Sequence, residues 1–125
     1  MFRTGIIGAG WIAEKMVQAL APLHDIETHA IASRSIEKAQ KFAKANNIPK
    51  AYGSYEEMVA DPDIDLVYIA TPHSHHFEHA MLALEHGKPV LVEKAFTANA
   101  AQAEELINTA RKKGLFITEA MWTRY

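Results

Sequence analysis

The chain has 125 residues, of which 49% are hydrophobic and 22% charged, a size and composition typical of one soluble globular domain. Its 13 Lys and Arg and 15 Asp and Glu give a formal net charge of −2, so we expect no polybasic surface for nucleic acid or membranes. Cysteine is absent, which excludes disulfides and thiolate chemistry, and the apolar runs are too short for a membrane span. The apolar stretch at residues 5–13 is interrupted by glycines and runs into Glu14 and Lys15, unlike a signal peptide, so we expect a cytoplasmic location.

The first half of the chain alternates short β-branched runs with segments of helical period. Strands are expected at residues 4–8 and 26–33, each followed by a helix. Ser35 can cap the second helix, which would end near Asn46, and the spacing within residues 54–57 is that of a capping box opening a short third helix. The apolar positions that would face the core are Ile12, Met16, Ala19, Leu20 and Leu23 in the first helix and Ile36, Ala39, Phe42 and Ala43 in the second.

The second half continues this alternation, with strands expected at residues 65–70, 89–93 and 115–118. Two helices lie between them, one stopped by Gly87 and one ending before Gly114. The buried stripes of these helices would be Phe77, Ala80, Met81 and Leu84, then Ala103, Leu106, Ile107 and Ala110. Strict alternation of strand and helix predicts one α/β domain over residues 1–125, a doubly wound parallel sheet with helices on both faces.

A glycine-rich turn joins the first expected strand to its helix. Gly8, Gly10 and Ala13 match the pattern G-x-G-x-x-G/A, in which the first glycine permits the tight turn and the second lets the backbone approach a pyrophosphate. Trp11 and Ile12 would then offer backbone N–H groups at the positive helix end. The alternative is a turn required only by packing. In its strand–helix context the motif predicts a Rossmann dinucleotide-binding fold.

The end of the second strand indicates which dinucleotide is bound. NAD-binding units usually carry Asp or Glu about twenty residues beyond the last small residue of the motif. Ser33 stands there, followed by Arg34, with Lys38 one turn into the helix. A hydroxyl and two cations suit a 2′-phosphate, so NADP is the preferred cofactor and NAD the alternative. Arg34 and Lys38 could equally be a solvated helix start.

Glu93 and Lys94 follow an expected strand, at the sheet edge where α/β proteins bind ligands. A partly dehydrated lysine there can shuttle a proton during carbinol–carbonyl interconversion. Glu93 would orient it or form part of the nicotinamide wall. The alternative is an exposed ion pair in a loop.

Four histidines lie close together in the sequence: His73, His75, His76 and His79. Their spacing could place pairs on one helix face, but no cysteine is available and acidic neighbours are few, so no native metal is expected. We expect instead that one or two histidines line the cofactor ribose and that the others face solvent. The turn before them would contact the cofactor through Ala70, Thr71 and Pro72.

Four stretches, in order along the chain, resemble the N-terminal half of the Gfo/Idh/MocA oxidoreductases: residues 5–10, 31–35, 70–76 and 87–94. Residues 119–125 are similar to the branch that contains dimeric dihydrodiol dehydrogenases and NADP-linked xylose dehydrogenases. The resemblance implies hydride transfer between NAD(P) and a hydroxyl carbon of a sugar, polyol or diol.

The resemblance also assigns roles to single residues. It implies that Lys94 is the catalytic lysine, although Ala95 replaces the proline of the family's Glu-Lys-Pro motif. His73 stands where the family more often has Asn, at a cofactor contact. His76 would lie near the nicotinamide ribose. The remaining implied contacts, to the cofactor phosphates or nicotinamide, are Trp122 and Arg124.

Family members continue into a second α/β domain that supplies most substrate contacts. We therefore expect this chain to be a cofactor-binding domain cut from a longer dehydrogenase, inactive alone and a homo-oligomer, if any, only at full length. The alternatives are a non-catalytic NAD(H)-sensing regulatory domain and an interaction module with a vestigial site.

Overall fold

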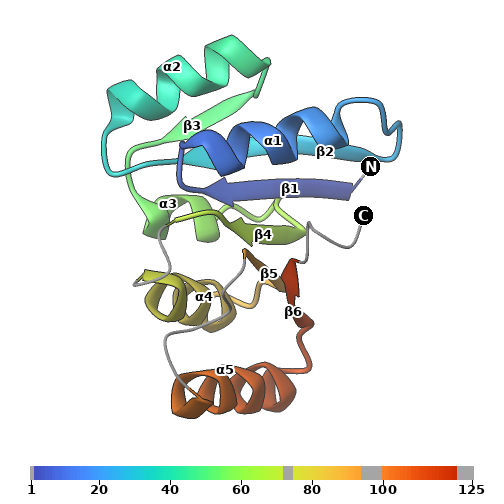
Figure 1. Cartoon of the computed structure of the whole chain (residues 1–125), viewed down its shortest axis with the longest axis vertical. Coiled ribbons are helices and arrows are strands. Elements are labelled where there is room, and N and C mark those ends of the chain that lie inside the picture. Colours follow the sequence, from blue (N-terminus) through green and yellow to red (C-terminus); the bar gives the residue numbers. More distant parts are fainter. Residues whose placement is uncertain (1, 72–74, 94–99, 121–125) are drawn as a thin grey trace.

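The computed structural model describes residues 2–71, 75–93 and 100–120, with only the backbone described at 93, 100 and 118–120. Within them, six parallel strands form one sheet in the order β3-β2-β1-β4-β5-β6 (Figure 1). The strands are β1 Phe2–Ile7, β2 Ile26–Ala32, β3 Lys50–Tyr52, β4 Leu66–Ile69, β5 Val90–Glu93 and β6 Ile117–Ala120. The order reverses between β1 and β4, which is the place where sheets of this kind bind ligands.

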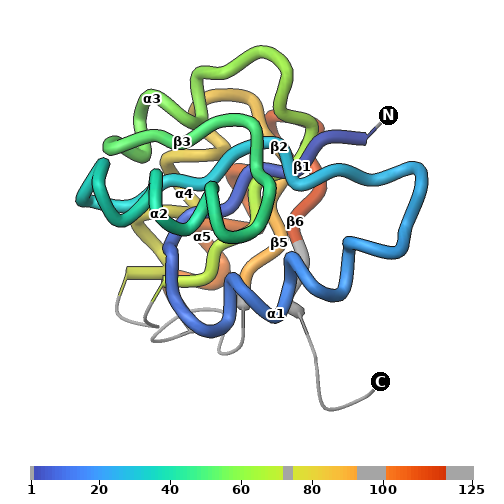
Figure 2. The backbone as a smooth tube through the Cα atoms, turned by 90° about the horizontal axis from the view of Figure 1, so that it is seen from above, coloured from blue at the N-terminus to red at the C-terminus, as the bar shows by residue number. Residues whose placement is uncertain are grey.

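In the described part of the chain, five helices cover the sheet: α1 Trp11–Leu20, α2 Ile36–Asn46, α3 Tyr55–Val59, α4 His76–Glu85 and α5 Ala100–Lys113. Viewed from above, α1 and α3 lie on opposite sides of β1 and β2 (Figure 2). The expected doubly wound parallel sheet is therefore confirmed.

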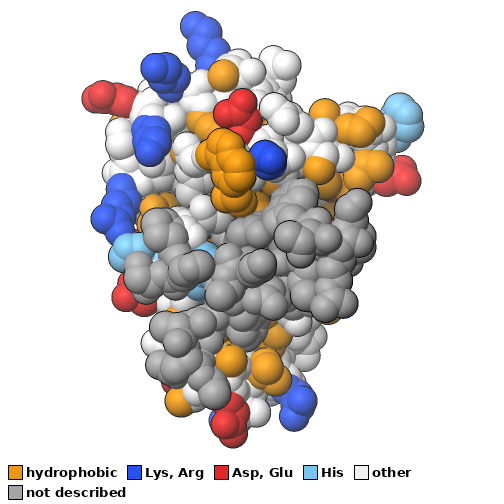
Figure 3. All heavy atoms as spheres, viewed as in Figure 1, with side chains coloured by type: hydrophobic (Ala, Val, Ile, Leu, Met, Phe, Trp, Pro, Cys, Tyr) orange, Lys and Arg blue, Asp and Glu red, His pale blue; other side chains and the backbone are white. Residues whose placement is uncertain are grey.

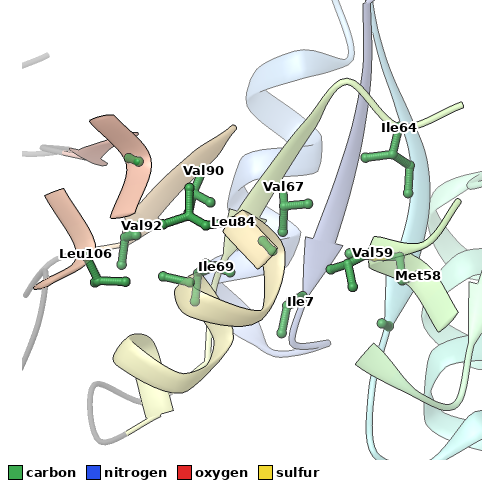
Figure 4. Close-up of a cluster of buried hydrophobic side chains, with 14 of the residues drawn as sticks. Ile7, Met58, Val59, Ile64, Val67, Ile69, Leu84, Val90, Val92 and Leu106 are labelled. Atoms are coloured by element: carbon green, nitrogen blue, oxygen red, sulfur yellow. The ribbon is translucent and has the colours of Figure 1, made fainter. Parts of the chain in front are cut away.

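The core consists of two clusters, one on each face of the sheet. On one face, side chains from β1, β4 and β5 pack against α3, α4 and α5, as Figure 4 shows for Ile7, Ile69, Leu84 and Leu106. On the other face, Ile6, Ile31 and Tyr68 pack against α1 and α2. Fully burying one such side chain contributes about 1.5–3 kcal/mol, so residues on both faces of each central strand hold the ligand-binding edge in place.

Local signals define the helix ends as expected. Ser35 accepts a hydrogen bond from the backbone N–H of Lys38, and Ser54 accepts one from that of Glu57. Asn47 ends α2 in the left-handed region, with φ of 57°. These caps satisfy backbone groups that the helices leave without partners.

Several expected core positions and boundaries were wrong. Ala19 is exposed, and Leu23 is 48% exposed because α1 has already ended at Leu20. Ile36 lies over the backbone of Gly53 rather than over the sheet and is 43% exposed.

The α5–β6 region also differs from expectation. Ile107 is 40% exposed because its neighbour Leu106 takes the position facing the sheet. The last strand begins at Ile117, two residues beyond the expected start, and the short strand β3 was not expected at all. Among the described helices, none is both long enough and apolar enough to cross a membrane.

Candidate functional site

An open pocket of about 560 Å³ lies where β1, β2 and β4 end. It brings together nine of the sequence-predicted cofactor contacts: Gly8, Gly10, Trp11, Ile12, Ser33, Arg34, Lys38, Ala70 and Thr71. Three further residues complete the lining: Ala9, Ser35 and Tyr55. Segments far apart in sequence thus meet at the predicted position on the sheet edge.

Gly8 is held between two strands. Its N–H donates to Ala32 O at 2.9 Å, and the next strand is tied in by the bond from Ala70 N to Ile7 O, also 2.9 Å. Its φ of +105° is a conformation that favours glycine, and a Cβ would lie 3.1 Å from the carbonyl of Ala70. A side chain at Gly8 would therefore disturb the turn itself.

Gly10 has a different role. It is the N-cap of α1 in an extended conformation, and a Cβ there would meet no protein atom within 4 Å. The protein therefore has room for a side chain at this position. The empty space lies on the surface of the turn, where it lets a ligand approach the backbone.

The first turn of α1 presents free backbone donors. Gly10 supplies no side-chain cap, and the first intrahelical bond runs from Glu14 N to Gly10 O at 3.1 Å. The N–H groups of residues 11–13 therefore have no acceptor within the helix. Together with the positive end of the helix dipole, they fit the charge and the acceptor oxygens of a diphosphate.

The end of β2 adds a hydroxyl and positive charge. The Ser33 Oγ accepts a hydrogen bond from Ser35 N at 3.4 Å, which leaves its own O–H available to donate. Arg34 is exposed and donates from Nη2 to Nε2 of His75 at 3.3 Å. Lys38 follows in the first turn of α2, and Lys and Arg side chains gather over this helix (Figure 3). None of the described residues that line the pocket is acidic.

Two buried histidines of α4 form hydrogen bonds with Thr71. His76, 1% exposed, donates from Nε2 to Thr71 O at 2.6 Å, and His79 Nδ1 lies 2.8 Å from Thr71 Oγ1. Burial, with smaller contributions from the charges of His75 and Arg34, lowers the pKa of His79 to about 4, so it is neutral at physiological pH. His79 is 6% exposed, so it is not one of the histidines that face solvent.

Tyr55 is a pocket residue that sequence reasoning missed. It is the first residue of α3, and its ring packs edge-on against His79 with centroids 4.5 Å apart. Nothing local distinguishes it from an ordinary helix-start aromatic, because its place in the pocket results from the packing of α3 beside the ends of β2 and β4.

Five predicted site residues lie outside the described part of the chain: Pro72, His73, Lys94, Trp122 and Arg124. The backbone of Glu93 is described as the last residue of β5, a parallel neighbour of β4. The C-terminal end of strand β5 therefore lies at the same edge of the sheet as the pocket.

Comparison with known proteins gives matches over nearly the whole chain. The chain is 49% identical to trans-1,2-dihydrobenzene-1,2-diol dehydrogenase of Xenopus tropicalis, over 97% of this chain and 37% of that protein. It is 48% identical to D-xylose 1-dehydrogenase (NADP(+)) of Hypocrea jecorina, over 97% of this chain and 34% of that protein. The chain thus spans little more than a third of the length of these relatives.

A solved structure gives the same result. A 3-ketoreductase from Actinomadura kijaniata, in complex with TDP-benzene and NADP, superposes with a TM-score of 0.89 and 35% identity, covering 94% of this chain and 37% of that one. Residues 2–121 match the family model described as "Oxidoreductase family, NAD-binding Rossmann fold". The resemblance noted from the sequence is confirmed, and the chain belongs to the Gfo/Idh/MocA family of oxidoreductases as its NAD-binding Rossmann domain.

Proposed function

We propose that this chain is the NADP(H)-binding part of an oxidoreductase that transfers a hydride between nicotinamide and a hydroxyl carbon of a sugar, polyol or diol. The proposed reaction is supported by the activities for which the relatives are named, a diol dehydrogenase and a xylose dehydrogenase. The relatives named above are dehydrogenases and a reductase, and none of their names favours a regulatory role.

The observation that carries the coenzyme preference is the chemistry at the end of β2. Ser33, Arg34 and Lys38 line the same pocket as the glycine turn, without a carboxylate among the described lining residues. A carboxylate there would accept hydrogen bonds from the ribose hydroxyls of NAD and repel a 2′-phosphate. A hydroxyl donor, a guanidinium and an ammonium would instead bind that phosphate.

Different groups of described residues would bind different parts of the coenzyme. The backbone N–H groups at the start of α1 would hold the diphosphate, and the β2 end would hold the adenosine phosphate. Thr71, held by His76 and His79, would form the wall leading from the diphosphate toward the nicotinamide. The bound nicotinamide supplies the hydride chemistry.

Lys94 is the proposed proton shuttle, since it directly follows Glu93 at the end of β5. In its ammonium form, a lysine there would give a proton to a developing alkoxide, and in its neutral amine form it would take one from a hydroxyl. Glu93 is proposed to orient this lysine. Pro72, His73, Trp122 and Arg124 complete the proposed coenzyme contacts, and each stays a prediction.

The test is a calorimetric comparison of NADPH and NADH on the wild-type chain and on a Ser33→Asp variant. We expect the wild type to bind NADPH more tightly by about tenfold or more, because a charge-assisted hydrogen bond contributes roughly 1.5–3 kcal/mol. Ser33→Asp should remove that preference. Equal affinities for the two coenzymes in the wild type would contradict the proposed NADP preference.

A further inference from the structure

A second polar cluster lies on the α3 side of the sheet, where β2 and β3 meet the segment between α3 and β4. At its centre is His29, which is 8% exposed and whose two ring nitrogens have no hydrogen-bond partner among the described residues. Buried polar side-chain atoms are rarely left unsatisfied, and such an exception requires an explanation, of which an ion is one. The coenzyme pocket does not include this histidine.

A β-bulge directs His29 toward acidic residues. Thr4 pairs with Thr28, but Gly5 pairs with Ala30, so His29 is the extra residue opposite β1. Bulges re-aim side chains in this way. As a result, Nε2 of His29 lies 3.6 Å from Oδ2 of Asp61, within ion-pair range and beyond a good hydrogen bond.

The cluster presents three potential metal ligands. One ligand atom from each of His29, Asp61 and Asp63 lies within 4.8 Å of the other two. The side chain of Asp61 is 2% exposed, whereas that of Asp63 is 56% exposed, so the cluster opens to solvent on the Asp63 side. An ion could therefore reach the buried carboxylate of Asp61 from the exposed side of the cluster, at Asp63.

Asp61 is held in place as a metal-binding carboxylate would be. Its Oδ2 accepts a hydrogen bond from Tyr52 OH at 2.7 Å, and its Oδ1 accepts one from Asp63 N at 2.9 Å. Burial would raise the pKa of Asp61, but these hydrogen bonds and Lys50 lower it to about 2. Outer hydrogen bonds of this kind orient the ligands of protein metal sites.

A lysine ammonium now stands between the two carboxylates. Lys50 Nζ lies 3.2 Å from Asp61 Oδ2 and 3.9 Å from Asp63 Oδ2, and its side chain is 43% exposed. The ammonium marks a position of favourable potential for a cation. Because the stem is exposed, it can turn toward water without disturbing the core.

Two other charged groups border the cluster. Oε2 of Glu27 lies 3.7 Å from His29 Nδ1 and is also paired with Arg3 at 3.3 Å. Lys88 donates to the backbone carbonyls of Asp61 and Ile64 at 2.7 and 2.9 Å, which fixes the segment that carries both aspartates. The ligands are thus held by the fold before any ion binds.

We propose that His29, Asp61 and Asp63 form a binding site for a divalent transition-metal ion of the Zn²⁺ class, with Lys50 taking its place when no ion is bound. One imidazole and two carboxylates suit Zn²⁺, whereas Ca²⁺ and Mg²⁺ prefer oxygen ligands throughout. A bound ion would link β2 to the segment before β4. The proposed metal site would stabilise the fold, and it does not depend on the coenzyme proposal.

The test is a Zn²⁺ titration of the untagged chain by calorimetry, with Co²⁺ absorption as a report on coordination. Asp63→Asn should weaken Zn²⁺ binding by more than about tenfold and should leave the fold intact, since Asp63 is exposed. Lys50→Met should strengthen binding, because the competing ammonium is removed. His24→Gln changes an exposed histidine and is the matched control, with no change expected.

The opposite effects of two variants make the result decisive. A purely structural ion pair predicts no Zn²⁺ site and no gain from Lys50→Met. The proposal is overturned if the wild type does not bind Zn²⁺, or if Asp63→Asn binds it as tightly as the wild type. Loss of binding in His75→Gln with unchanged binding in His29→Gln would also overturn it, because the ion would then sit among the other histidines.

Discussion

The coenzyme pocket and the His29 cluster are both polar regions of one sheet, but they are built in opposite ways. The pocket relies on backbone groups and exposed cations around a glycine turn, with Gly10 facing open space. The cluster relies on two buried side chains, His29 and Asp61, and Asp61 accepts a hydrogen bond from Tyr52 of β3. The first arrangement leaves about 560 Å³ open to a ligand, whereas the second brings three ligand atoms within 4.8 Å of one another.

The largest expected effect is on the pocket. Gly10→Val adds a side chain where no protein atom lies within 4 Å, so the fold should persist while the surface that would meet the diphosphate is covered. We expect NADPH affinity to fall by more than about a hundredfold, or roughly 2.7 kcal/mol, with little change in thermal stability. Calorimetry and circular dichroism measure the two quantities. Full retention of affinity would place the diphosphate elsewhere.

Protonation of His79, which lies behind the pocket residue Thr71, should lower the free energy of unfolding in acid. Its folded pKa of about 4 lies below the ordinary value of 6.5, so the unfolded chain binds more protons between these values. Stability should therefore fall as the pH drops from 6.5 to 4. Denaturant unfolding of the wild type and of His79→Gln measures this. A pH dependence that is the same in both variants would assign it to another group.

The His29 cluster should respond in a lower pH window. Asp61 has a folded pKa of about 2, below the ordinary value of 3.8, so its contribution to stability is present above pH 4 and lost as the pH falls toward 2. The contribution is about 2 kcal/mol. Tyr52→Phe removes one hydrogen bond to Asp61 and should reduce the loss in this window without changing the His79 window. If the stability of Tyr52→Phe depends on pH as that of the wild type does, the hydrogen bond from Tyr52 does not set the pKa of Asp61.

The smallest effect concerns coenzyme choice. Arg34→Ala should weaken NADPH binding by about tenfold and NADH binding hardly at all, because only NADPH carries the 2′-phosphate that Arg34 is proposed to bind. The loss of NADPH affinity should stay modest because the guanidinium is exposed and partly solvated. Lys41→Ala, on the same helix but outside the main pocket, is the control. Equal losses for both coenzymes would mean that Arg34 contacts the adenine or the diphosphate and not a 2′-phosphate.

The same contrast explains what could be predicted from the sequence. The pocket rests on local patterns: Gly8 and Gly10 lie in a short motif, and Ser33 lies at a fixed distance beyond it. The doubly wound parallel sheet follows from the alternation of strands and helices and from right-handed crossovers. These features depend on residues near one another in the chain, so periodicity and motifs find them.

The features that were missed depend on tertiary packing. Helical period does not say which of two adjacent apolar residues faces the sheet, hence the error at Ile107. The strand β3 has three residues, too few for a periodic signal. Tyr55 reaches the pocket, and His29 reaches Asp61, only after distant elements have packed.

The central claim is that backbone N–H groups at the start of α1 bind the coenzyme diphosphate. Amide chemical shifts of residues 10–13, followed by NMR during titration with NADPH, test it most directly. We expect large, saturable shifts at Trp11 and Ile12, with the amide of Ala19 near the far end of the helix unchanged. Amides that stay unmoved at saturating NADPH would contradict it.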